Sequence, residues 1–429
     1  MIRVPLLLVL LMTTAAHVRG QDLVVPARLS LEEALRLANE RNSNLAAARN
    51  TVEIAEAQRT DARLRPNPAV SLDSDNYPLF EPARPGFFNN QQLTVRIDQE
   101  LELAGRRRWR TEAADTAISA AEATFLDHRR RLEFDVRRAY FGIVLAKTDL
   151  DVAQATLDEI DNVIRLNRAR YDQGEISGGE LRRIQVERLK FVDDLFGAQL
   201  SLRNARSGLL ALFNATDLSV DFDVVETLNV AASAGQPATA APLPLDAPAL
   251  RTQALALRPD LLAAQRQVQR ADTETRLQRA LRTPNITVGG GYQRNFGANA
   301  VVFGVTVPLP ISNRNQGGVA RADAERRQAT NLATATATGV LLDVQQAINA
   351  VDVARARVEY IEREYLTPSR ESRDIVLAAY RLGTADLIDF LDAQRAFRDT
   401  LRTYNRALYE QRLGVFQLAA ATGGASSVR

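Results

Sequence analysis

The 429-residue chain contains no cysteine. We therefore expect no disulfide, no thiolate metal site and no lipid-modified N-terminal cysteine. Histidine and methionine are almost absent as well: the chain has His17, His128, Met1 and Met12 and no others. These are the residues that most transition-metal sites and histidine-assisted nucleophiles need. The composition thus predicts no metal site, no cofactor and no enzyme activity.

Long apolar runs are also missing. No stretch beyond the N-terminus offers the roughly 18 uninterrupted apolar residues of a membrane helix, so we expect no such helix. The first twenty residues place Arg3 before an apolar run, Val4–Leu11, and then several small residues. This is the layout of a secretory signal peptide. We expect residues 1–20 to be removed by cleavage after Gly20, or alternatively after Ala16, and the mature chain to leave the cytoplasm.

An excess of basic charge is lacking too. The chain has 54 basic and 52 acidic residues, and loss of Arg3 and Arg19 with the signal peptide would leave 52 of each. Nucleic-acid binding needs a clustered basic excess, so we expect no nucleic-acid partner.

The sequence repeats itself. The stretch ARLRPNPAV from Ala62 is echoed by ALRTPNITV from Ala280, and ARYDQG from Ala169 is echoed by AAYRLG from Ala378. Such self-similarity indicates a duplicated structural unit. We divide the chain into a first repeat over 21–228, a linker over 229–248 that is rich in Ala, Pro and Ser, a second repeat over 249–422, and a tail over 423–429.

Each repeat contains two short segments that alternate apolar and polar residues, as half-buried strands do. They predict β-hairpins at about 67–102 and 285–309. Each hairpin precedes a long helical pattern, and we expect helical hairpins over 105–213 and 313–422. The apolar positions of both patterns recur in steps of four and three, which is typical of a coiled coil. The second seam includes Val340, Val344, Ile361 and Tyr365. The first helix alone would be about 100 Å long.

Strands of about ten residues with one apolar face suit a bilayer on one side and a wet lumen on the other. Four strands cannot close a barrel, and open strand edges are not tolerated in lipid. If the hairpins are embedded in a membrane, several chains must therefore contribute strands to one barrel.

From LSLEEALRLANERN at Leu29 to GVFQLAAATG at Gly414, the chain resembles the TolC-like outer membrane factors. Two stretches, QELELAGRRRWR from Gln99 and VPLPISNRNQGGVARADAE from Val307, resemble the CzcC-type heavy-metal-efflux branch. The resemblance implies a mainly α fold with a small β part. Three chains would form a 12-stranded β-barrel in the outer membrane and an α-barrel of coiled-coil hairpins in the periplasm. It also implies a passive duct that works with a periplasmic adaptor protein and an inner-membrane pump of the RND type.

The resemblance points to a gate at the end of the second helical hairpin. Asp389 and Asp392 match positions where the family places aspartates around the periplasmic entrance. A spacing of three puts both carboxylates on one helix face, and threefold symmetry would gather them into a ring that attracts cations. From the residues alone, ordinary surface acids are the better interpretation, and the resemblance reverses that preference.

A latch at the same entrance is also implied. Tyr380 matches a tyrosine that, in the family, hydrogen-bonds an acid on the neighbouring hairpin, and that acid's position is Glu180 here. The arginine of the family's second latch is replaced by Ala385, so a full copy of the closed-state lock is not expected.

The turns that end the two helical hairpins resemble the tips through which the family meets its adaptor. Glycine permits such tight reversals, and this alone explains Gly174 and Gly383. Docking is the additional prediction from the resemblance. The tip residues are Gly174, Glu175, Ile176, Ser177, Arg381, Leu382, Gly383, Thr384 and Ala385.

The exported substrate is open at this level. Metal cations are the preferred prediction, and drug efflux or type I protein secretion are the alternatives. A periplasmic adaptor or a structural coiled-coil protein would fit the duplicated plan of hairpins less well.

Overall fold

The chain is built twice from the same series of elements, and the computed structural model describes it over residues 25–75, 91–228 and 246–424. The expected signal peptide and most of the expected linker and tail lie outside these residues. The first half contains α1 (Leu31–Arg41), α2 (Ser43–Arg63), β2 (Ala69–Asp75), β3 (Gln92–Leu101), α3 (Arg106–Asp172) and α4 (Gly178–Leu212). The second half contains α6 (Ala247–Leu257), α7 (Pro259–Ala280), β5 (Ile286–Asn295), β6 (Ala298–Thr306), α8 (Gln316–Ile361), α9 (Thr367–Arg381) and α10 (Leu387–Ala421).

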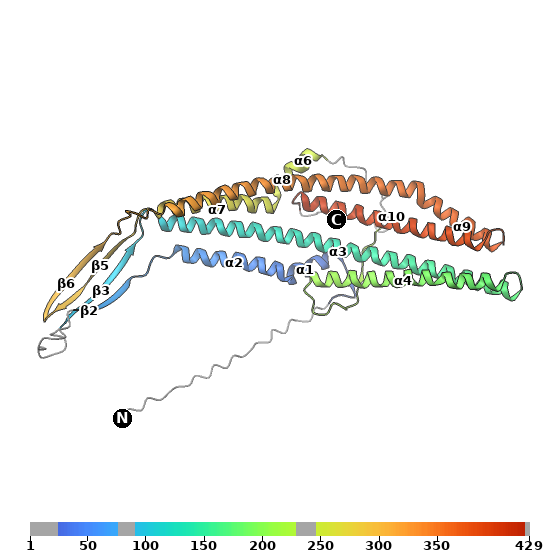
Figure 1. The fold of residues 1–429 in the computed structure, drawn as a ribbon, viewed down its shortest axis with the longest axis horizontal. Coiled ribbons are helices and arrows are strands. Elements are labelled where there is room, and N and C mark those ends of the chain that lie inside the picture. Colours follow the sequence, from blue (N-terminus) through green and yellow to red (C-terminus); the bar gives the residue numbers. More distant parts are fainter. Residues whose placement is uncertain (1–24, 76–90, 229–245, 425–429) are drawn as a thin grey trace, which may run out of the picture.

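The molecule is elongated, with the strands at one end and the two helical turns α3–α4 and α9–α10 at the other (Figure 1). A small parallel pair, β1 (Arg28–Leu29) and β4 (Asp223–Val224), joins the start of the first half to its end. Within the described ranges, no helix is both long and apolar enough to span a membrane.

The two expected β-hairpins join edge to edge into one sheet. Its order is β2-β3-β5-β6, all antiparallel. Along the central ladder Val95 lies opposite Tyr292 and Ile97 opposite Gly290. The face that carries these side chains is apolar and open: Val70 is 71% exposed and Phe303 is 85% exposed. The sheet therefore presents an apolar face that the described parts of the chain leave exposed.

The opposite face of the sheet is polar and includes glycines next to an ion pair. We call Gly289 and Gly304 the glycine floor. The Arg96 guanidinium lies 3.0 Å from the Asp98 carboxylate, and Asp98 is level with Gly289 and Gly304 on the next two strands. A Cβ atom at Gly289 would come within 1.8 Å of the Asp98 carboxylate, and one at Gly304 within 2.8 Å of the Arg96 guanidinium. The absence of side chains on these glycines lets the ion pair lie flat across the neighbouring strands.

Helix α3 is 67 residues long, or about 100 Å. Its apolar residues recur with the expected heptad spacing, and Val136, Ile143, Ala153 and Ile160 are buried. They pack against α4 and the helices of the second half, so the seam joins the two halves along the long axis.

The second long helix is interrupted, which the sequence prediction missed. A π-helical turn at Glu362–Leu366 separates α8 from α9. Pro368 lies in the first turn of α9, and proline lacks the amide proton and clashes with the carbonyl four residues earlier. The helix accommodates it by a local π-turn. The prediction that Tyr365 belongs to the buried apolar seam was wrong: this residue is 51% exposed and packs edge-on against Tyr360.

Equivalent residues fasten the helices of the two halves. Asn42, between α1 and α2, donates to the carbonyl of Leu212 at the end of α4 (3.0 Å). Arg258, between α6 and α7, donates to the carbonyl of Ala421 at the end of α10 (3.3 Å). Both contacts satisfy carbonyls that a helix end leaves unpaired.

Candidate functional site

Both helical hairpins reverse through the same kind of turn. Gly174 (φ 77°) and Gly383 (φ 75°) adopt the left-handed conformation, which glycine reaches without steric cost. The amide of the following residue, Glu175 or Thr384, donates to the carbonyl five residues back at 2.9 Å. These bonds form the Schellman motif that ends a helix. The turns of the two repeats are thus structurally equivalent.

Each turn leads into a helix through a capping box. The Ser177 hydroxyl accepts from the amide of Glu180 (3.2 Å), and the Glu180 carboxylate accepts from the amide of Ser177 (3.2 Å). In the second hairpin Asp386 and Asp389 form the same box, and the Asp389 carboxylate accepts from the amide of Asp386 at 3.3 Å. Glu180 and Asp389 therefore occupy equivalent positions, and each stabilises a helix start.

The two predicted gate acids, Asp389 and Asp392, are both exposed on the first turns of α10. They differ in their partners. Asp389 caps the helix, whereas Asp392 lies 3.1 Å from a guanidinium nitrogen of Arg395 and keeps 66% of its side chain exposed. Arg395 also reaches Glu187 on α4 at 2.6 Å. An exposed pair of this kind is weak, so Asp392 retains much of its field towards solvent.

Tyr380 is buried between the hairpins. Its hydroxyl donates to the side-chain oxygen of Asn167 on α3 (2.6 Å), and its ring stacks on Phe390 with centroids 5.6 Å apart. Burial raises the pKa of this hydroxyl above its ordinary value. Within the chain the structure therefore pairs Tyr380 with Asn167 and pairs the carboxylate of Glu180 with Ser177, and it does not bring the two predicted latch residues into a hydrogen bond with each other. The latch between them stays a prediction.

Arg170, which the sequence prediction missed, joins the two tips. From the last turn of α3 it donates to the carbonyls of Tyr380 (3.2 Å) and Arg381 (2.6 Å) at the end of α9. Its guanidinium also lies over the Tyr380 ring, 5.7 Å from the centroid. A cation at a helix C-terminus is favoured by the helix dipole. No local pattern in the sequence signals this contact, because its partners are more than 200 positions away.

An apolar cluster beneath the turns unites both hairpins. It contains the buried residues Leu157, Ile160, Val163, Ile184, Phe191, Tyr380, Leu387, Phe390 and Leu391. Ala385, at the position where the resemblance implies an arginine, packs against this cluster. The tip of one hairpin cannot move away from the other without exposing this core.

The predicted docking residues are mostly exposed, and some of them also make contacts within the chain. Leu382 is 80% exposed and the Glu175 side chain 59%. The Arg381 side chain is 53% exposed and contacts Glu159 at 3.1 Å. The Thr384 hydroxyl donates to the carbonyl of Ala379 at 3.1 Å. Ile176 is half-buried. The surface of the tips therefore combines apolar, acidic and basic side chains, and its docking role stays a prediction.

Arginines of α10 bind acids of α4 along the hairpins. Arg398 pairs with Asp194, and Arg402 lies 3.6 Å from the same carboxylate. With Arg395 and Glu187 they form a ladder between the two hairpins. The hydrogen bond from Lys190, assisted by Arg395, holds the pKa of Glu187 below its ordinary value.

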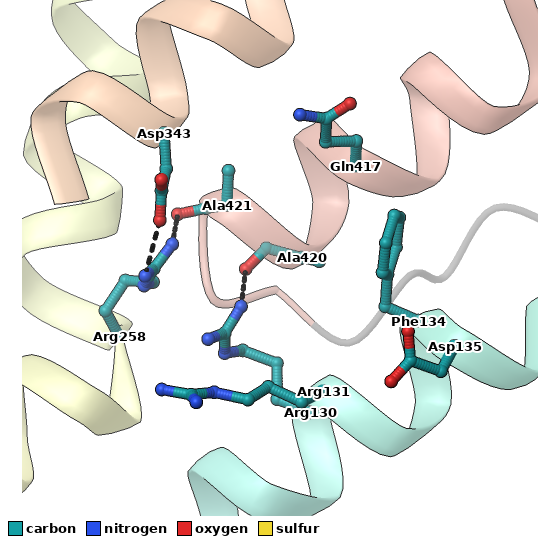
Figure 2. Close-up of a pocket in the computed structure, with 9 residues that line it drawn as sticks. All are labelled: Arg130, Arg131, Phe134, Asp135, Arg258, Asp343, Gln417, Ala420 and Ala421. Carbon is teal, nitrogen blue, oxygen red and sulfur yellow. Dashed lines mark hydrogen bonds and ion pairs between the residues drawn. The ribbon is translucent and has the colours of Figure 1, made fainter. Parts of the chain in front are cut away.

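A hollow of about 330 Å³ lies midway along the molecule, where α10 ends (Figure 2). Arg258 spans it from Ala421 to Asp343, which is 2.9 Å away, and Arg130 donates to the carbonyl of Ala420 at 3.0 Å. Arg258 is only 4% exposed. The arginines here hold a helix end, so the hollow is a structural junction. In the described part of the chain, no group of histidines or acids is arranged to hold a metal ion.

The sequence matches a known protein family over both repeats. A family model described as outer membrane efflux protein matches residues 34–215 and 250–424. Among curated proteins, the chain is 27% identical over 369 residues to the cobalt-zinc-cadmium resistance protein CzcC of Cupriavidus metallidurans, covering 86% of this chain and 83% of the relative.

Solved structures share the fold. The channel CusC superposes with a TM-score of 0.74 at 18% identity, covering 92% of each chain. The outer membrane channel MtrE of Neisseria gonorrhoeae, in its open state, superposes with a TM-score of 0.72 at 20% identity, covering 95% of this chain and 94% of that one.

Proposed function

Because the chain belongs to the outer membrane efflux protein family, we propose that it is one subunit of a homotrimeric exit duct that carries metal cations from the periplasm to the exterior. The family is one of outer membrane channels and not of enzymes. The proposal also includes metal cations as the substrate, a periplasmic adaptor protein as a partner and an inner-membrane pump of the RND type.

The sheet with two unpaired edges is the observation that best supports a trimer. Its order begins with β2 and ends with β6, and its apolar face is uncovered over the full width, from Val70 to Val305 (71% and 67% exposed). Unpaired strand edges are not tolerated in lipid. Pairing of β6 in one copy with β2 in the next would close the sheet, and three copies would give the twelve strands that the family resemblance implies.

The lumen of such a barrel would be lined by the polar face. The Arg96–Asp98 pair lies flat over glycine on that face, which leaves space above it for passing solutes. Interior polar residues are typical of barrels that conduct.

At the other end, Asp389 and Asp392 would line the periplasmic entrance of the helical tunnel. Their exposure on the same turns of α10 supports this role. Cations would be concentrated there by the acids, with Asp392 partly balanced by Arg395. Tyr380 and Glu180 would contribute to closing the entrance, and the tips around Gly174 and Gly383 would receive the adaptor.

A strain that lacks this chain tests the substrate. We expect it to become sensitive to zinc, cobalt or cadmium and to regain resistance when the chain is restored. Copper and a panel of hydrophobic drugs are the comparison compounds. Sensitivity to the drugs alone would replace the metal substrate by drug efflux and leave the duct intact.

Fractionation tests the duct itself. We expect an outer-membrane species that stays trimeric in SDS until it is heated. A soluble monomer would overturn the proposal.

A further inference from the structure

Exposed arginines cluster where the helices meet the sheet. They stand at all four junctions, namely α2 to β2, β3 to α3, α7 to β5 and β6 to α8, which lie together at one end of the helical body (Figure 1). We name them the arginine collar: Arg63, Arg65, Arg107, Arg108, Arg282 and Arg314.

No carboxylate lies within ion-pair distance of these arginines among the described residues, although Arg314 donates to the carbonyl of Pro310 at 3.1 Å. Their neighbours in the chain, by contrast, hold other elements. In the GRRRWR stretch, Arg106 donates to the carbonyl of Leu281 (3.2 Å), and Arg110 binds Glu102 (2.6 Å). Arg107 and Arg108 lie between them in sequence and are exposed. They lie off the helix face that Arg106 and Arg110 share, because residues four apart share a face and those in between do not. The Arg108 guanidinium lies over the Trp109 ring, 5.0 Å from its centroid, which leaves its charge without a counter-charge in the described part of the chain. One motif therefore supplies both arginines that hold neighbouring elements and exposed arginines without a carboxylate partner among the described residues.

Part of the collar surrounds a hollow of about 590 Å³. Arg63, Arg107 and Arg108 line it together with Thr111, Glu112 and Asp115. Its two acids already have partners: Glu112 lies 3.8 Å from Arg276, and Asp115 pairs with Arg59. Unlike the hollow at the end of α10, where the arginines hold carbonyls and acids, this one presents unneutralised guanidinium groups.

Apolar side chains are exposed directly beside the collar. Leu64, between Arg63 and Arg65, is 60% exposed. Leu309 and Ile311, shortly before Arg314, are 74% and 75% exposed. Leu309 and Ile311 follow β6, the edge strand of the sheet, and Leu64 ends α2, so exposed apolar side chains lie between the sheet and the arginines. A ligand that covers both must have an anionic head and an apolar body.

We propose that the arginine collar binds the phosphate groups of anionic phospholipids, in the membrane leaflet that meets the helical body. Guanidinium groups match phosphate oxygens in bidentate geometry, and basic residues next to a bilayer attract anionic lipid. The apolar neighbours single out lipid over free phosphate or an acidic protein. The inference rests on the proposed duct function, because that function places the sheet in a membrane.

Lipid binding to the full-length trimer tests the proposal. The trimer is purified in a non-ionic detergent, and the binding of phosphatidylglycerol and of phosphatidylcholine with the same acyl chains is titrated by native mass spectrometry. We expect the wild type to prefer phosphatidylglycerol. The double variant Arg107→Gln with Arg108→Gln should weaken phosphatidylglycerol binding on the order of tenfold and leave phosphatidylcholine binding unchanged.

The chain offers a matched control. Arg182 and Arg183 are adjacent exposed arginines near the opposite end of the molecule. Their replacement by glutamine removes the same charge and should leave the lipid preference unchanged. If it weakens binding equally, the effect is one of net charge and the collar is refuted.

Other outcomes are also decisive. A wild type without preference for phosphatidylglycerol overturns the proposal, and so does inorganic phosphate that displaces the lipid at equal concentration. If the Arg107–Arg108 variant yields no SDS-resistant trimer, Arg63→Gln with Arg65→Gln repeats the test at a neighbouring junction. A wild type that is trimeric in the outer membrane but lacks the preference refutes the collar alone, whereas a soluble wild type refutes the duct.

Discussion

The hydroxyl of Tyr380 donates a hydrogen bond to the side-chain oxygen of Asn167, 2.6 Å away, and so joins the second helical hairpin to the first. Both residues are buried, with 6% and 1% exposure. A hydrogen bond in such a place costs more to break than an exposed one, because the partner is left unsatisfied.

Tyr380→Phe should therefore loosen the tips. It removes the donor and leaves the Asn167 oxygen unpaired, at a cost of about 1–3 kcal/mol. We expect faster amide hydrogen exchange at the ends of α3 and α9 and a higher single-channel conductance. Glu180→Gln serves as the comparison: if the entrance latch joins Tyr380 to Glu180 in the assembled duct, both variants raise conductance, and if Asn167 is the sole partner, only Tyr380→Phe does.

The charge of the gate acids can be separated from their capping role. Asp389→Asn with Asp392→Asn removes both charges and keeps side-chain oxygens that can cap a helix. We expect a higher conductance and weaker block by multivalent cations in planar-bilayer recordings. Asp389→Ala should also loosen the start of α10, because it removes the carboxylate that accepts from the Asp386 amide in the capping box. Unchanged block in the asparagine variant would remove these acids from the gate.

Gly383 tests the tips. Its φ of 75° disfavours any larger residue, while nothing lies within 4 Å of where its Cβ would be. Gly383→Val should thus distort the turn by about 1–2 kcal/mol without a clash in the core. If the tip docks an adaptor, export should be lost while the SDS-resistant trimer remains. Retained export would contradict docking at this turn.

The close contact between Gly289 and Asp98 predicts that a second substitution can compensate for a first one. Gly289→Ala should lower the yield of SDS-resistant trimer, because its Cβ would overlap the Asp98 carboxylate at 1.8 Å. Adding Asp98→Ala removes the overlapping group and should restore the yield. Failure of the double variant to recover would mean that Gly289 is needed for another reason.

The ion pair of Arg258 with Asp260 should make the free energy of unfolding depend on pH. Burial opposes ionisation of Asp260, but the hydrogen bond and charge of Arg258 outweigh it and hold the pKa of Asp260 below its ordinary value. Such a carboxylate stabilises the fold above its unfolded pKa of about 3.9, and that contribution is lost as pH falls through the folded pKa.

Arg258→Ala should accordingly cost about 1.5–3 kcal/mol at neutral pH. The difference from the wild type should shrink below pH ~4. Thermal unfolding of the trimer across pH measures both. A difference that is constant with pH would show that lost packing, and not the ion pair, is responsible.

Much of the fold follows from periodicity. Heptad spacing identified buried positions such as Val136 and Ile160, and alternation identified the strands, because both signals come from residues near one another in sequence. Pro368 is a readable signal for the break between α8 and α9, but the predicted seam continues to Tyr365, which lies inside the π-helical turn just before this proline.

The site was less accessible. The pattern Asp386-x-x-Asp389 could have revealed the capping box, as could Ser177-x-x-Glu180. The contacts of Asn167 with Tyr380, and of Arg170 with the end of α9, could not be predicted. They join residues in different repeats whose relative positions depend on the packing of whole helices.

The pairing of β3 with β5 also determines when the sheet can form as the chain is synthesised. It pairs residues 92–101 with residues 286–295, so the centre of the sheet cannot form until most of the chain has emerged. Contacts so distant in sequence form slowly. Until then the first hairpin exposes apolar strands with free edges, which favour aggregation. A newly made chain therefore has to be kept apart from others until its own second half arrives, even though it must later join other copies.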